Sequence, residues 1–100
     1  MYEIRLRVAA EQDLADAASW YERQQPGLGY RFLNEVEVVL AAIAERPRMY
    51  PVLHRNTRRA LLRRFPFGVF FRIEADTVVV FGVLHASRAP AHWTTRTPEP

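Results

Sequence analysis

The side chains of this sequence that could do chemistry are mainly arginines, and they are concentrated in one stretch. Residues 46–72 contain eight arginines and neither a lysine nor an acidic residue. A guanidinium is a rigid fork of N–H donors that binds phosphate or carboxylate groups through paired hydrogen bonds. A small fold seldom needs so one-sided a charge to hold together, so the stretch predicts a surface for an anionic partner. Nucleic acid and an acidic protein segment are the two candidates.

Four of these arginines lie in the segment RRALLRRF, residues 58–65, which alternates as a β-strand does. Such a strand would place Arg59 and Arg63 on one face and Arg58 and Arg64 on the other. Two interpretations remain open at this point. The charges either keep an edge strand from aggregating, or they form a contact surface for an acidic partner or nucleic acid.

A second candidate position follows the apolar segment 77–85. Arg88 comes three residues after His85, and loops at strand ends often carry function. Arginine there can stabilise charge that develops on a phosphate, while His85 or His92 could carry a proton. The alternative is a solvated arginine beside a histidine that closes the core. Trp93 could likewise stack on a base or close the core.

Other chemical signatures are missing. The chain has no cysteine, and Ser19 and Ser87 do not lie in a G-x-S-x-G motif. The segment Gly27–Gly29 lacks the third glycine and the preceding strand of a dinucleotide-binding motif. The three histidines do not have zinc-ligand spacing. We therefore predict neither a metal nor a cofactor.

The elements that must position these residues follow from the hydrophobic periodicity. Residues 2–8 alternate between apolar and charged side chains, which indicates a half-buried strand. Residues 9–25 have a helical stripe and stop at Pro26-Gly27, and a second helix runs from about Leu28 to Arg46 before Pro47. Because only about three residues separate the helices, they should pack as an antiparallel hairpin.

Residues 47–57 are expected to be an irregular connection. Strands are then predicted at 58–65, 67–74 and 77–85, with a hairpin turn from Glu74 to Thr77. The last strand is apolar throughout residues 78–84, so it should be central in the sheet. The predicted class is α+β in the order β-α-α-β-β-β, with a helix hairpin packed on a small, mainly antiparallel sheet.

Composition sets the broad class of the protein. The chain has 100 residues, of which 49% are apolar, and a net charge of +3. It opens on a strand pattern without a leader-like segment, and no apolar run approaches about 18 residues. We therefore expect a cytoplasmic protein that does not interact with membranes. Residues 1–93 should form a single domain, and residues 94–100 a flexible tail.

Three motifs carry a family resemblance. WYE-x-x-x-PGLG-x-x-F begins at Trp20, RRFPFGVFFR at Arg63 and V-L-H-x-x-R at Val83. Over about residues 2–93 the sequence resembles the RelE/ParE toxins of type II toxin–antitoxin modules, often called plasmid stabilisation proteins. The resemblance implies the RelE-like fold and a cognate antitoxin that wraps the toxin with an acidic or amphipathic segment. It also implies that operator DNA is bound only through the antitoxin.

The family contains two mechanisms. ParE-type members poison DNA gyrase, whereas RelE-type members cut mRNA on the ribosome. Arg88 matches a basic position of the nucleases and Arg59 falls near another, but Gly68 stands where the nucleases carry an arginine. Trp93 stands near their catalytic tyrosine, and an indole cannot exchange a proton as a phenol does. The resemblance therefore favours a ParE-like gyrase inhibitor, a binding poison rather than an enzyme.

The residues expected to bind partners in such a protein are Arg58, Arg59, Arg63, Arg64, Arg88 and Trp93. We expect the antitoxin to lie over the basic face of the sheet and one helix edge, with its carboxylates paired to Arg63 or Arg64. One alternative is a ribosome-dependent mRNA endonuclease in which arginines 59, 63 and 88 hold phosphate and His85 carries the proton. A toxin-like binding protein that has lost activity is the other.

Overall fold

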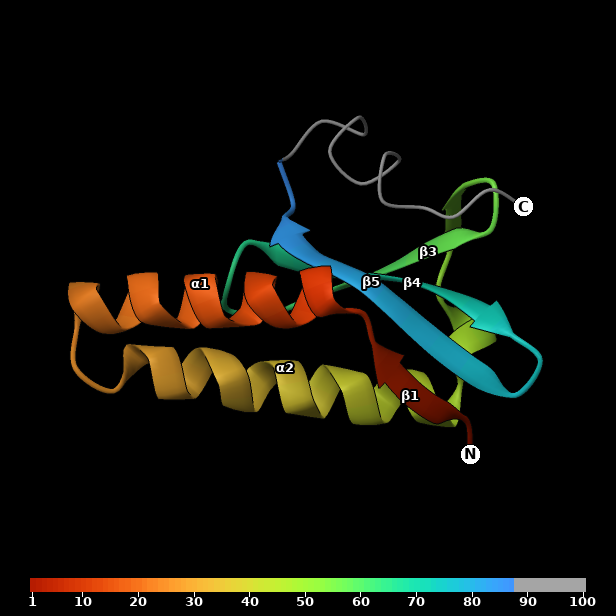
Figure 1. Ribbon diagram of the computed structural model, residues 1–100, viewed down its shortest axis with the longest axis horizontal. Helices are drawn as coiled ribbons and strands as arrows, with labels where there is room; N and C mark the ends of the chain where they lie inside the picture. The colour runs from red at the N-terminus through yellow and green to blue at the C-terminus, as the bar shows by residue number, and fades with distance from the viewer. Residues whose placement is uncertain (88–100) are drawn as a thin grey trace.

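The computed structural model describes residues 1–87, in which two helices cover one face of a five-stranded sheet (Figure 1). The elements in chain order are β1 (Glu3–Leu6), α1 (Val8–Gln24), α2 (Leu28–Glu45), the 3₁₀ helix η1 (Pro47–Met49), β2 (Val52–His54), β3 (Thr57–Leu61), β4 (Phe67–Glu74) and β5 (Thr77–His85). The α+β class and the helix hairpin on a mainly antiparallel sheet are confirmed. Among residues 1–87 no helix is both long enough and apolar enough to span a bilayer.

The strands lie in the order β1-β5-β4-β3-β2. The first strand pairs in parallel with the last, with Glu3 opposite Thr77, and the other neighbours are antiparallel. Figure 1 shows β1 beside the first half of β5. β5 is therefore central, as its apolar sequence predicts, and every residue from Val78 to Leu84 is buried.

The helix hairpin is closed by a carboxylate and a glycine. Glu22, near the end of α1, accepts hydrogen bonds from the backbone N–H groups of Gly27 (2.8 Å) and Gly29 (3.0 Å) at the start of α2. Gly27 has φ +89°, a left-handed conformation that suits glycine. A Cβ atom on Gly29 would lie 2.4 Å from the carbonyl oxygen of Ala18. The PGLG segment therefore serves the packing of the two helices.

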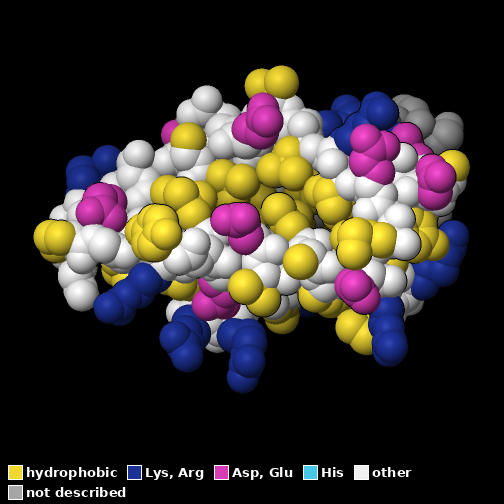
Figure 2. All heavy atoms as spheres, turned by 90° about the horizontal axis from the view of Figure 1, so that it is seen from below, with side chains coloured by type: hydrophobic (Ala, Val, Ile, Leu, Met, Phe, Trp, Pro, Cys, Tyr) yellow, Lys and Arg dark blue, Asp and Glu magenta, His cyan; other side chains and the backbone are white. Residues whose placement is uncertain are grey.

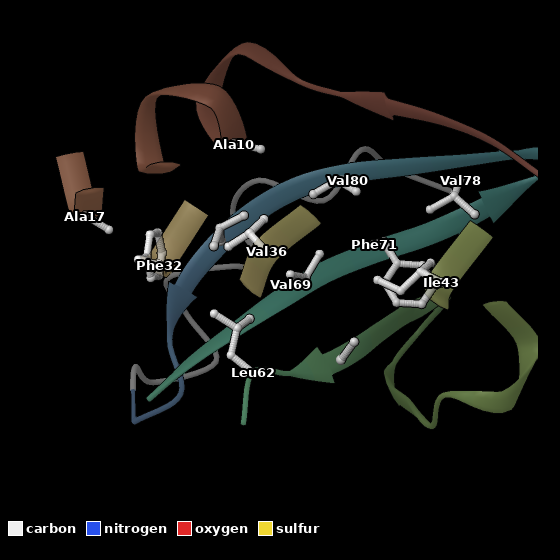
Figure 3. Close-up of a cluster of buried hydrophobic side chains, with 12 residues drawn as sticks. Ala10, Ala17, Phe32, Val36, Ile43, Leu62, Val69, Phe71, Val78 and Val80 are labelled. Carbon is white, nitrogen blue, oxygen red and sulfur yellow. The ribbon is translucent and has the colours of Figure 1, made fainter. Parts of the chain in front are cut away.

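The main core lies between the helices and the sheet (Figure 3). α2 contributes Phe32, Val36 and Ile43, which fall on one helical face, and the sheet contributes valines and phenylalanines from β4 and β5. Phe70, Phe81 and Leu84 form a second buried cluster. Phe70 lies between core residues along β4, so its side chain points to the sheet face away from the helices.

Two details of the predicted order are wrong. Residues 47–57 are not wholly irregular, because Val52–His54 forms a short edge strand paired with β3 through an irregular register. β3 ends at Leu61 rather than at Phe65. The chain turns there because the N–H of Leu62 donates to the carbonyl of Phe67 (2.9 Å), which closes the connection to β4. Arg63 and Arg64 therefore lie in a loop and not on opposite strand faces.

Candidate functional site

The β3–β4 loop, residues 62–66, and helix α2 enclose a groove of about 650 Å³, which we call the α2–loop groove. Its apolar lining includes Leu28 and Val38 of α2 and Phe65 and Pro66 of the loop. Its basic lining is Arg31, Arg63 and Arg64. Figure 2 looks onto the α2 side, where a band of hydrophobic side chains crosses the face and arginines project along its lower margin. The face combines apolar contact area with positive charge along one margin, and acidic side chains are distributed among the apolar ones.

Aromatic packing holds the loop against the helices. The ring of Phe65 lies 4.8 Å from that of Tyr21 and 5.2 Å from that of Phe32, both edge to face. Tyr21 also lines the groove, and burial raises the pKa of its hydroxyl above the ordinary value of 10.0. The phenol therefore stays neutral at physiological pH.

Glu35 fastens the loop to α2. Its Oε2 atom accepts hydrogen bonds from the backbone N–H groups of Arg63 and, at 2.9 Å, Arg64. The carboxylate thus binds backbone amides rather than the guanidiniums beside it. Among the described residues that line the groove, Glu35 is the one acidic side chain.

The guanidiniums of the groove are not neutralised within residues 1–87. The ion pairs found there join Arg5 to Glu3 (3.8 Å) and Arg72 to Glu74, and both lie on the sheet. Within the same range Arg31, Arg63 and Arg64 have no carboxylate partner for their side chains. Three guanidiniums without a carboxylate partner in the described part of the chain therefore line the groove, whereas the larger basic sheet surface expected from Arg58, Arg59, Arg63, Arg64 and Arg88 stays a prediction.

The two arginines of β3 have separate environments. Arg58 donates from Nη1 to the backbone carbonyls of Arg48 (3.1 Å) and Tyr50 (2.6 Å), so its guanidinium braces the turn after α2. Arg59 packs its aliphatic stem over Gly68, where an added Cβ would lie 3.1 Å from Cγ of Arg59. The glycine leaves room for this stem on the neighbouring strand.

His85 lies in another part of the molecule. Its ring packs against Phe67, with centroids 5.5 Å apart, and its Nδ1 atom lies 2.7 Å from the hydroxyl of Ser87. It lines a hollow of about 210 Å³ with Asp13 and Asp16 of α1, and none of these residues lines the α2–loop groove.

The structure thus gathers Arg63 and Arg64 in one groove and gives Arg58, Arg59 and His85 different neighbours. Arg88, His92, Trp93 and the predicted tail 94–100 lie outside the described residues. No group of three or more His, Cys, Asp or Glu side chains suited to a metal ion occurs within residues 1–87.

Sequence reasoning missed the carboxylates that organise these surfaces. It assigned no role to the acidic residues, whereas Glu35 binds loop amides and Asp13 accepts a hydrogen bond from the N–H of Val83 (2.9 Å). The sequence offered one indication for Glu35: it stands between the core residues Phe32 and Val36 along α2, near the helical face that packs on the sheet.

Comparisons with known proteins agree with this fold. Residues 4–90 match the family model described as the ParE toxin of the type II toxin–antitoxin system parDE. The chromosomal ParDE system from P. aeruginosa contains a similar structure, with a TM-score of 0.76 and 16% identity over 85% of this chain and 96% of that one. No curated protein sequence is similar enough to this chain to count as a relative.

Two further solved structures share the fold. The isolated E. coli RelE toxin has a TM-score of 0.66 and 15% identity, covering 95% of each chain. The RelBE2 toxin–antitoxin complex from Mycobacterium tuberculosis has a TM-score of 0.55 and 24% identity, covering 84% of this chain and 96% of that one. At these identities the likeness concerns the fold alone.

Proposed function

This chain belongs to the ParE toxin family of type II toxin–antitoxin systems, and from that premise we propose that it inhibits DNA gyrase and is held inactive by a cognate antitoxin. The observation that carries the proposal is the family match over residues 4–90. The toxin would act in the cytoplasm as a single domain over residues 1–93, and operator DNA would be reached only through the antitoxin.

The distribution of the basic residues supports a binding poison rather than a nuclease. Cleavage of RNA through its 2′-hydroxyl needs a base, an acid and charge stabilisation around one phosphate. His85 contacts Phe67 and Ser87 beside α1, Arg59 lies over Gly68, and Arg63 lines the α2–loop groove. Because these residues have different neighbours within residues 1–87, their arrangement supports gyrase rather than mRNA as the proposed target.

The α2–loop groove has the chemistry to receive an antitoxin. An amphipathic acidic segment could place apolar side chains against Leu28, Val38 and Phe65 and its carboxylates beside Arg63 and Arg64. The lack of internal ion pairs at these two arginines within residues 1–87 leaves their charge for such a partner. The named relatives from P. aeruginosa and M. tuberculosis are toxin–antitoxin systems, which agrees with a partner of this kind.

Parallel assays test the proposal. Purified toxin should block DNA supercoiling by gyrase in proportion to its concentration and leave mRNA intact on programmed ribosomes. Supercoiling that continues at saturating toxin would refute gyrase as the target, and cuts in the ribosomal A site would establish the endonuclease alternative. Induced expression without antitoxin should arrest growth, and coexpression of the antitoxin should restore it. Normal growth would instead identify an inactive binding protein.

A further inference from the structure

Glu35 is an unusual residue for its location. It is a carboxylate that lines a groove with three arginines, yet it makes no ion pair with them in the part of the chain that the structure describes. If the groove receives an acidic segment, a negative charge inside it should repel that segment. The contacts of Glu35 explain its presence.

A single oxygen of Glu35 joins α2 to the middle of the β3–β4 loop. Oε2 accepts the N–H of Arg63 and the N–H of Arg64, 28 and 29 positions farther along the chain. Within residues 1–87 these two amides have no other acceptor. Hydrogen bonds that backbone amides donate to charged acceptors are among the stronger ones in proteins.

The rest of the loop is anchored at its two ends. The N–H of Leu62 donates to the carbonyl of Phe67 (2.9 Å), and the N–H of Phe67 donates to the carbonyl of Phe65 (2.8 Å). The ring of Phe65 packs between Tyr21 and Phe32. Between these anchored positions, Glu35 accepts the backbone N–H groups of the two arginines.

We propose that Glu35 is a positioning residue, which orders the backbone of Arg63 and Arg64 so that their guanidiniums are held for an acidic segment. This inference rests on the proposed antitoxin contact, but not on gyrase as the target. A partner that meets a loop already ordered avoids the entropy cost of ordering it on binding. Glu35 thereby strengthens the binding of acidic groups despite its own negative charge.

The geometry provides a way to separate position from charge. Both N–H groups use the same oxygen, so the amide oxygen of glutamine in Glu35→Gln can accept both bonds without the charge. Glu35→Ala removes the acceptor and the charge together. Glu37→Ala is the matched control, because Glu37 is an exposed residue of the same helix outside the groove.

The first measurement needs no partner. Amide hydrogen exchange of Arg63 and Arg64 should be slow in the wild type and in Glu35→Gln, and fast in Glu35→Ala. The second is fluorescence anisotropy with poly-L-glutamate and a designed acidic amphipathic helix, and with poly-L-lysine as the negative probe. The cost of ordering the backbone of these two residues on binding should make Glu35→Ala bind the acidic probes about tenfold more weakly. Glu35→Gln and Glu37→Ala should bind them at least as tightly as the wild type.

The effects of Glu35→Ala and Glu35→Gln on affinity for the acidic probes distinguish a positioning role from a role of the charge alone. If Glu35 acted only through its charge, Ala and Gln would both tighten binding, and that result would overturn the inference. Unchanged affinity of Glu35→Ala well below its melting temperature would do the same, since a purely structural role affects only stability. In an Arg63→Gln/Arg64→Gln background the effect of Glu35→Ala should vanish. Wild-type protein that binds neither acidic probe would also overturn the inference, whereas a negative gyrase assay alone would bear only on the target.

Discussion

The tight approach of α1 and α2 makes Gly29→Ala the most informative test of the fold. An added Cβ would lie 2.4 Å from the carbonyl oxygen of Ala18, and 3.1 Å and 3.2 Å from Oε1 and Cβ of Glu22. The side chain of Glu22 can shift, but the carbonyl belongs to the helix backbone. Restoring ordinary contact distance requires the two helices to separate locally by about 1 Å.

The expected cost follows from three contributions. Replacing glycine by alanine in a helix normally gains up to about 1 kcal/mol. Overpacking of a close contact costs about 1–3 kcal/mol. Displacement also weakens the bond from the N–H of Gly29 to the Glu22 carboxylate, and a hydrogen bond to a charged group contributes about 1.5–3 kcal/mol. The free energy of unfolding should therefore fall by about 2–4 kcal/mol.

Urea denaturation followed by circular dichroism measures this change directly. In a domain of this size the melting temperature should also drop by about 4–8 °C for each kcal/mol. Gly27→Ala is the control, because its Cβ would meet nothing within 4 Å and would only strain a backbone with φ +89°, at about 1–2 kcal/mol. If Gly29→Ala proves as stable as the wild type, or more stable, the account of helix packing is wrong.

Three other perturbations address the charged and aromatic residues. Reversal of both groove charges, Arg63→Glu with Arg64→Glu, should weaken the antitoxin complex at least tenfold and reduce its salt dependence in calorimetric titrations. The control Arg23→Glu, on the exposed end of α1, should leave the affinity unchanged. Equal affinity of the two variants for the antitoxin would reject the placement of the contact. Arg58→Met removes two hydrogen bonds to backbone carbonyls, so urea denaturation should show a loss of about 1–3 kcal/mol while binding of acidic probes is kept. Burial raises the pKa of Tyr21 above 10.0, so the contribution of the neutral phenol to the free energy of unfolding is complete below pH 10 and is lost as the pH rises through the folded-state pKa. Alkaline titration followed by circular dichroism should show a smaller loss of stability in Tyr21→Phe than in the wild type. Identical titration curves would contradict this.

The hydrophobic periodicity, together with the proline and glycine residues that end helices, was enough to predict most of the helices and strands. Pro26-Gly27 and Pro47 mark the ends of the two helices, and the strands 67–74 and 77–85 were predicted with the bounds that the structure has. β2 was missed because three residues, all exposed, carry too little alternation to identify a strand. β3 was predicted too long because the pattern of residues 62–65 continues the alternation after the chain has turned.

The candidate site was only partly predictable for a physical reason. The sequence shows that arginines cluster, and the structure places Arg63 and Arg64 in one groove with Arg31. The sequence does not show that Arg58 binds carbonyls of its own chain or that Glu35 holds the loop. Such contacts join residues up to 70 positions apart, as Asp13 and Val83 do. Local patterns describe which face of an element is apolar, but not which distant backbone groups a polar side chain reaches.

The parallel ladder between β1 and β5 bears on how the chain folds during synthesis. The strand made first has its sheet partner at residues 77–80, so it stays unpaired until nearly the whole chain has been translated. Pairing across such a sequence separation is slow, because a long loop must close before any contact rewards it. The helices can form earlier, but they then expose their apolar side to the surrounding solution. We therefore expect nascent chains that stop before β5 to be prone to aggregation.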